Sequence, residues 1–173
     1  MRNSVLATLA FAGAMALPLD AQQAPTDPQI AHIVVTANQV DIDAGKLAQK
    51  QGSTKAVRDF GKQMAVDHAG VNKQATQLVT KLKVKPEANP TSESLKKGGD
   101  ENVAKLKKLN GKEFDKAYVD NEGTYHQSVL DAVDKTLVPN AKNAELKALI
   151  EKVRPAFVAH LDHAKHLQGE LAK

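Results

Sequence analysis

The chain has 173 residues, of which 42% are hydrophobic and 3% aromatic, and this length suits one compact domain better than two. It contains no cysteine, which excludes disulfides, thiolate metal ligands, a cysteine nucleophile and the lipidated cysteine of a bacterial lipoprotein. Its formal charge of +4 comes mainly from lysines, which neither alternate with aromatic residues nor accompany an arginine cluster. We therefore expect the lysines to form a solvated face and the protein to have no nucleic-acid partner. At most, we expect a weak attraction to anionic envelope surfaces.

Residues 1–21 have the layout of a secretory signal peptide. Arg2 supplies a short positive start, and residues 5–17 form an apolar run that is too short to span a bilayer. We expect cleavage after Ala21, with cleavage after Ala16 or Ala24 as alternatives, and a mature protein that is periplasmic or secreted. Residues 22–27 form a polar linker. Because no second segment of this kind follows, we expect no transmembrane segment in the mature chain.

Apolar residues recur at spacings of three and four in the rest of the chain, as is typical of helices with one buried face. A helix is predicted over about 28–51, starting at Asp27-Pro28 and ending at Gly52. Ser53 is predicted to cap a second helix that stops near Pro86. These two helices form an antiparallel hairpin.

In the second half of the chain, the sequence pattern predicts a crossover followed by another pair of helices. Residues 85–111 are expected to contain one short helix, broken or frayed at Gly98-Gly99. A third long helix is expected over about 112–137, a turn at Pro139-Asn140, and a fourth helix to the C-terminus with a bend at Pro155. The sequence therefore predicts an all-α, ferritin-like four-helix bundle over residues 28–173 with a long crossover between its second and third long helices.

Each long helix carries an acidic or histidine side chain within or beside its apolar stripe. An isolated buried carboxylate costs several kcal/mol, so such groups are expected to partner one another. Counting from the turns places them at similar heights in the bundle, within about one helical turn of 5 Å. The candidate metal-ligating residues are Asp41, Asp67, His68, Glu122, His126 and His160.

Two arrangements satisfy such a cluster, and the sequence leaves both open. One is a bound transition metal, and the other is a metal-free network of carboxylates and imidazoles. A carboxylate-bridged di-iron site would need Glu-x-x-His on two helices, but Ala65 and Phe157 stand three residues before His68 and His160. A single iron, zinc or copper ion remains as the metal hypothesis, and Met64 adds slight weight to copper.

Other chemistry finds no support in the sequence. No phosphate-binding loop, nucleophile elbow, HExxH motif or EF-hand loop is present, so we assign no catalytic residue. Tyr118 and Tyr125 are interpreted as core residues. The histidines at 160, 163 and 166 form a weaker surface option for adventitious zinc or nickel.

Several segments together resemble one bacterial family. They are Asp41–Ala48, Phe60–Met64 with Asp67-His68, Leu106–Tyr118, His126, and Pro155 with His160-Leu161. Over about residues 27–167 the chain is similar to the exported family catalogued as domain of unknown function 4142, whose members are often labelled outer-membrane or membrane proteins.

The resemblance implies a ferritin-like helical fold without an established activity. The family's recurring polar positions fall on Asp41, Asp67, His68, His126 and His160. Asp41 stands where the family commonly has Glu, and Arg154 where an apolar residue usually precedes the proline. Likeness of fold does not transfer ferroxidase chemistry, and no segment after the signal supports the membrane label.

The sequence therefore predicts an exported helical bundle with no assigned catalytic activity, and its interior cluster is a candidate site for one metal ion in metal handling or a stress response. The competing class is an envelope interaction module in which the cluster only stabilises the fold. A third class is an oxidoreductase that uses bound iron.

Overall fold

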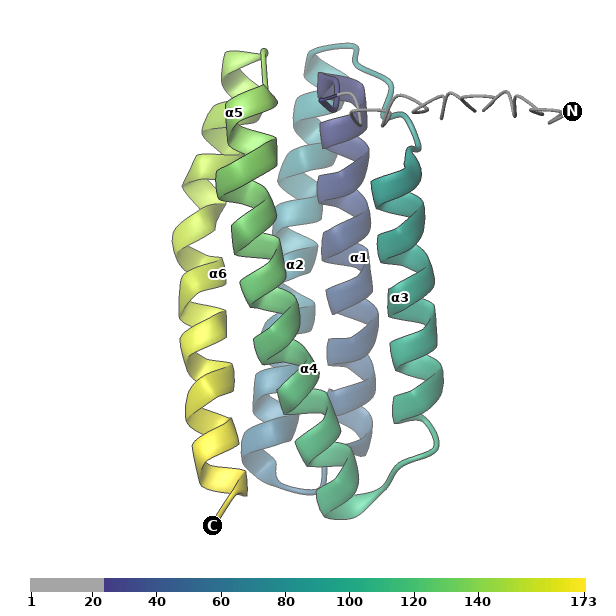
Figure 1. Cartoon of the computed structure of the whole chain (residues 1–173), viewed down its shortest axis with the longest axis vertical. Helices are drawn as coiled ribbons and strands as arrows, with labels where there is room; N and C mark the ends of the chain where they lie inside the picture. Colours follow the sequence, from purple (N-terminus) through teal and green to yellow (C-terminus); the bar gives the residue numbers. More distant parts are fainter. Residues whose placement is uncertain (1–23) are drawn as a thin grey trace, which may run out of the picture.

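The computed structural model describes residues 24–173, so the predicted signal peptide lies outside the described residues. The regular structure of the described part is helical throughout (Figure 1). In chain order the elements are α1 (Asp27–Gln51), α2 (Lys55–Lys81), α3 (Pro90–Leu106), α4 (Gly111–Ala132), the π-helix η1 (Val133–Leu137), α5 (Val138–Asn140) and α6 (Ala144–Leu171). The predicted all-α class is confirmed.

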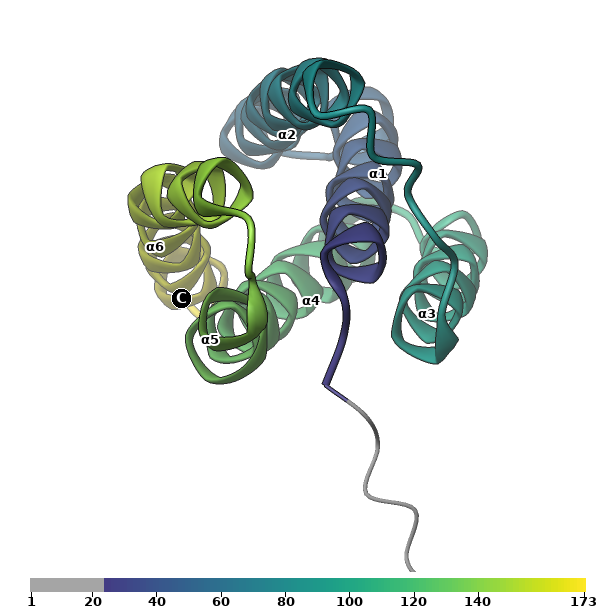
Figure 2. The ribbon, with the colours of Figure 1, turned by 90° about the horizontal axis from the view of Figure 1, so that it is seen from above.

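The helices α1, α2, α4 and α6 surround a common core, and α3 packs on the outer side of α1 (Figure 2). The pairs α1/α2 and α4/α6 are antiparallel, and α3 returns the chain along the bundle from the end of α2 to the start of α4 (Figure 1). This is the predicted bundle with a long crossover. Within residues 24–173, no helix combines the length and hydrophobicity needed to cross a bilayer.

The turn between α1 and α2 differs in detail from the prediction. Thr54, not Ser53, is the N-cap of α2, and its hydroxyl accepts from the amide of Val57. Ser53 instead turns toward Asp115 of α4, whose carboxylate accepts from both the amide and the hydroxyl of Ser53 and from the amide of Thr54. The fully buried Asp115 therefore ties the first hairpin to α4 and satisfies amides at the start of a helix.

The predicted break at Gly98-Gly99 is wrong, because α3 runs through both glycines without interruption and is 17 residues long. Gly99 is buried against Val40 of α1, and a Cβ at residue 99 would lie 2.6 Å from Cγ2 of Val40. The missing side chain allows α3 to approach α1 closely, and tertiary packing outweighs the low helix propensity of the pair.

The predicted turn at Pro139-Asn140 is also displaced. The backbone stays helical to Asn140, and the turn into α6 spans residues 141–143. The π turn of η1 precedes Pro139, and the amide of Val138 donates to the carbonyl of Val133. A wider turn accommodates a proline, which lacks an amide hydrogen and crowds the preceding turn. Pro155 lies inside α6, which continues through it.

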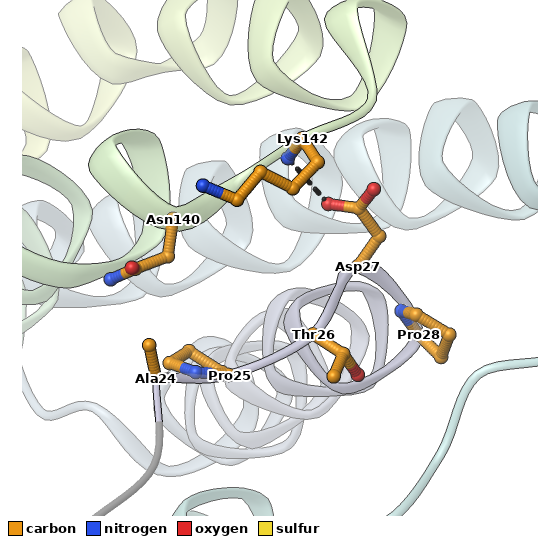
Figure 3. A pocket seen from close by; sticks show the side chains of 7 residues that line it. All are labelled: Ala24, Pro25, Thr26, Asp27, Pro28, Asn140 and Lys142. Atoms are coloured by element: carbon orange, nitrogen blue, oxygen red, sulfur yellow. Dashed lines mark hydrogen bonds between the residues drawn. The ribbon is translucent and has the colours of Figure 1, made fainter.

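The start of α1 is fixed to the loop before α6. The Asp27 carboxylate accepts from the amides of Lys142 and Asn143, both at 2.8 Å, beside a surface pocket at this end of the bundle (Figure 3). This contact sets the height of α1 relative to α6, and therefore the relative heights of the polar residues at the middle of each helix.

The core consists of apolar clusters near the two ends of the bundle with polar side chains between them. One cluster includes Phe60, Leu106 and Phe114, and another includes Ile30, Leu137 and Ile150. Buried carboxylates and imidazoles in such a setting are shielded from solvent by apolar layers on both sides.

Candidate metal centre

Five buried polar residues from the middles of the four bundle helices form one group, which we call the polar cluster. It comprises Asp41 of α1, His68 of α2, Glu122 and His126 of α4, and His160 of α6. Their side chains are at most 4% exposed. Two overlapping subsets have ligand atoms within 4.8 Å of one another: the three histidines, and Asp41 with Glu122 and His126.

Asn38 fixes the protonation of His68. The Asn38 amide nitrogen donates to the carbonyl of Val34 at 2.7 Å, so its oxygen faces Nδ1 of His68, also at 2.7 Å. We therefore assign the hydrogen of His68 to Nδ1, which leaves a lone pair on Nε2. Burial lowers the pKa of His68 to about 2, so the ring is neutral. Phe157 stacks on this ring at a centroid distance of 5.2 Å and holds its orientation.

His126 is held in the same tautomer by its own helix. Its Nδ1 lies 3.0 Å from the carbonyl oxygen of Glu122, one turn earlier, and this contact assigns the hydrogen to Nδ1. Burial lowers the pKa of His126 to about 4. The lone pair on Nε2 therefore points into the cluster, as in His68.

Asp41 faces both imidazoles. Its Oδ2 lies 3.0 Å from Nε2 of His68 and 3.4 Å from Nε2 of His126, and the two nitrogens lie 3.4 Å apart. These distances suit ion pairs, yet neither oxygen of Asp41 has a hydrogen-bond partner when both carboxyls are ionised, whereas a protonated Glu122 donates to Asp41. The tautomers explain this, because both histidine hydrogens point away from Asp41. When Asp41 is ionised, three electron-rich atoms thus face one another without a hydrogen between them.

His160 contributes another lone pair from α6. Its Nε2 lies 3.0 Å from Oδ2 of Asp67, an acceptor when ionised, so Nε2 carries the hydrogen. The other ring nitrogen, Nδ1, is buried without a partner. Burial lowers the pKa of His160, and the bond to Asp67 partly opposes this shift. A carboxylate that orients a histidine in this way is a common partner of metal-ligating imidazoles.

Glu122 and Asp41 form a carboxyl pair on the α4 side of the cluster. Burial raises the pKa of Asp41 to about 7, and it raises the pKa of Glu122 well above its ordinary value, with a further contribution from the charge of Asp41. Without a cation, burial therefore favours the protonated form of Glu122. Oε2 of Glu122 and the hydroxyl of Tyr118, one turn earlier on α4, are also buried without partners.

The donor set fits a transition metal ion. Imidazole nitrogen and carboxylate oxygen bind iron, zinc and copper at about 2.0–2.2 Å, which separates adjacent ligands by about 3.0 Å in octahedral and about 3.4 Å in tetrahedral geometry. The separations among Oδ2 of Asp41 and the two Nε2 atoms, 3.0, 3.4 and 3.4 Å, fall in this range. A cation would also satisfy the unpartnered acceptors, which are costly to bury.

Comparison with known proteins places the chain in a family. Residues 12–167 match the family described as domain of unknown function DUF4142. The chain belongs to this family. No curated protein and no solved structure matches the chain. The family description names no function for the DUF4142 protein, and the ferritin-like relationship and membrane label remain predictions.

The structure of this DUF4142 protein brings five of the six predicted ligand residues together. The sixth, Asp67, lies at the margin, where its carboxylate binds His160 and its side chain is 43% exposed. Met64 lies in the apolar cluster with Phe60 and Tyr118. His166 faces solvent in an ion pair with Glu170 and stands apart from the cluster.

Sequence reasoning missed Asn38 and Asp115. Asn38 lies three residues before Asp41, on the same side of α1, and this spacing was the available signal for a partner of the cluster. Asp115 gave no comparable signal, because the amides that it binds belong to residues 53 and 54 in another helical hairpin.

Proposed function

We propose that this DUF4142 protein binds one iron, zinc or copper ion in the polar cluster, with Asp41, His68, His126 and His160 as ligands and Glu122 beside them. The observation that carries the proposal is the triangle of Oδ2 of Asp41 and the Nε2 atoms of His68 and His126. With Asp41 ionised, each atom presents a lone pair to the other two, and a shared cation turns this repulsion into attraction.

The surrounding residues support ligation because they orient the imidazoles in advance. Asn38 and the Glu122 carbonyl hold the Nδ1 hydrogens of His68 and His126, and Asp67 holds the Nε2 hydrogen of His160. Partners of this kind fix ring tautomers and increase ligand basicity. Imidazole-rich donors also favour first-row transition metals over magnesium and calcium, which prefer oxygen.

The proposed role is metal handling or a stress response in the cell envelope. Export is supported by the signal-peptide layout of residues 1–21. A bound ion of this class supplies Lewis acidity, and iron or copper also supplies one-electron chemistry. Burial of the ligands in an apolar core supports retention of the ion over rapid exchange with solvent.

Metal content of the mature protein tests the proposal. Protein purified without a histidine tag is analysed by elemental mass spectrometry, before and after loading with iron, zinc or copper and desalting. The test variant carries His68→Ala, His126→Ala and His160→Ala, and circular dichroism checks its fold. The matched control carries His163→Ala and His166→Ala, which removes histidines of α6 outside the proposed ligand set.

About one ion per chain is expected in the wild type and in the control, and none in the test variant. If the loaded wild type retains no ion, the cluster is a metal-free network in which protonated carboxyls partner the imidazoles. The search for function would then move to envelope partners of the exposed surface.

A further inference from the structure

We propose that the ion enters the polar cluster between α2 and α6, and that Asp67 is the first ligand it meets before passing to His160. This inference rests on the proposed function and adds the route. Asp67 is 43% exposed, whereas the side chains of the cluster are at most 4% exposed. Among the side chains that the described structure bonds to the cluster histidines, Asn38 is buried and Asp67 alone reaches solvent.

The Asp67 carboxylate is suited to receive a cation from solution. Its Oδ2 is 3.0 Å from Nε2 of His160, whose buried Nδ1 has no partner. A carboxylate has about four acceptor positions, so the bond to His160 leaves others for an incoming ion. One side chain at the surface thus directly contacts a proposed ligand.

Near Asp67, polar side chains lie along the boundary between α2 and α6. One turn from Asp67, Oε1 of Gln63 lies 3.2 Å from Nδ1 of His163. Gln63 is exposed and His163 partly so. We call Gln63, Asp67, His160 and His163 the α2–α6 seam. Gln63 and Asp67 are exposed, and rotamer changes of exposed side chains take nanoseconds or less without movement of the helices.

The other boundaries of the bundle are closed by tighter contacts. Between α1 and α2, a Cβ at Gly45 would lie 2.7 Å from the carbonyl oxygen of Gly61, so the two backbones touch. The hydroxyl of Tyr125 in α4 donates to the carbonyl of Ala37 in α1 at 2.8 Å. Between α4 and α6, the Gln168 side chain covers Gly123 and donates to Asp120.

The kinetics of Co²⁺ binding test the route. Stopped-flow absorbance of the cobalt d–d bands gives association and dissociation rates, and equilibrium titration gives affinity. The test variant is Asp67→Asn, which removes the charge but keeps an acceptor for His160. The control is Asp59→Asn, which makes the same charge change on an exposed residue of α2 paired with Lys55.

In the Asp67→Asn variant, association is expected to slow by roughly 10-fold, because the incoming ion loses the charged group that it meets first. The d–d spectrum should keep its wild-type form, because the amide oxygen still accepts from His160, and any loss of affinity from this weaker partner appears in the dissociation rate. The Asp59→Asn variant should retain wild-type rates. Wild-type association rates in Asp67→Asn, with or without weaker affinity, would overturn the entry route while leaving the metal site in place. Absence of Co²⁺ binding by the wild type would overturn both proposals.

Discussion

The properties of the polar cluster depend on residues that hold hydrogens away from its centre. An imidazole buried among carboxylates would ordinarily direct an N–H toward them, yet Asn38 and a backbone carbonyl hold the hydrogens of His68 and His126 on the far side. Asn38 is itself anchored by its bond to Val34. A neutral amide of fixed orientation therefore determines which nitrogen of His68 carries the hydrogen and which keeps its lone pair.

Replacement of Asn38 by Ala is expected to weaken metal binding by about 10- to 100-fold, because His68 loses the acceptor that fixes its tautomer. Competition with a chromophoric chelator measures the affinity. The control is Asn72→Ala, which removes a bond from α2 to the carbonyl of Val35 without touching the cluster histidines. Equal losses in the two variants would show that Asn38 acts only through general stability.

At the level of elements, α3 shows how one glycine can position a whole helix. Gly98 and Gly99 are adjacent in the same helix, but a Cβ at residue 98 meets nothing within 4 Å, whereas a Cβ at residue 99 would overlap Val40. At residue 98 glycine only lowers helix propensity, whereas at residue 99 close packing against Val40 requires glycine.

The pair gives opposite predictions for stability. Gly98→Ala is expected to increase the free energy of unfolding by about 0.5–1 kcal/mol, because alanine loses less conformational freedom in a helix. Gly99→Ala is expected to reduce it by about 1–3 kcal/mol, because the stiff Val40 side chain must shift. Urea unfolding followed by circular dichroism measures both. Stabilisation by Gly99→Ala would contradict the close packing of α3 on α1.

For the whole molecule, the free energy of unfolding of the metal-free protein depends on pH, because the buried carboxyls and the buried histidines act in opposite directions. The pKa values of Asp41 and Glu122 are raised in the folded protein. Above about pH 4 the folded protein therefore keeps protons that the unfolded chain releases. As a result, the contribution of these two carboxyls to the free energy of unfolding falls as pH rises. The lowered pKa values of His68 and His126 act in the opposite direction, and their contribution rises until about pH 6.5.

Above about pH 6.5 the carboxyl contribution prevails, because the histidines are then neutral in both states while the pKa values of Asp41, at about 7, and of Glu122 are raised. The metal-free protein should therefore lose stability as pH rises above about 6.5, by up to about 1.4 kcal/mol per pH unit for each carboxyl proton that only the folded state still holds. Thermal unfolding in the presence of a chelator measures the trend. Glu122→Gln, which stays neutral at all pH values, should flatten the decline; an equal decline in both proteins would contradict the assignment to Glu122.

The sequence alone determined the helical class, the approximate helix ranges and the polar residues that face inward. These follow from local spacing, since a period near 3.6 fixes which side of a helix each residue occupies. That is why Asp41, Glu122 and His160 are predicted to lie within their stripes and His126 at the edge of its stripe. Asp67 and His68 lie on the two flanks of one stripe, so the period alone does not show which of them is buried.

Only the tertiary structure decided which atoms meet. The tautomers of His68 and His160 depend on Asn38 and Asp67, each supplied by another helix, and the path of α3 through two glycines depends on Val40 of α1. The role of Asp115 likewise depends on a turn about sixty residues earlier. Such contacts join residues that are distant in the chain, and their separations of a few ångströms are set by how the helices pack. Helical periodicity specifies which face of a helix a residue occupies, but it does not specify which helix packs against that face.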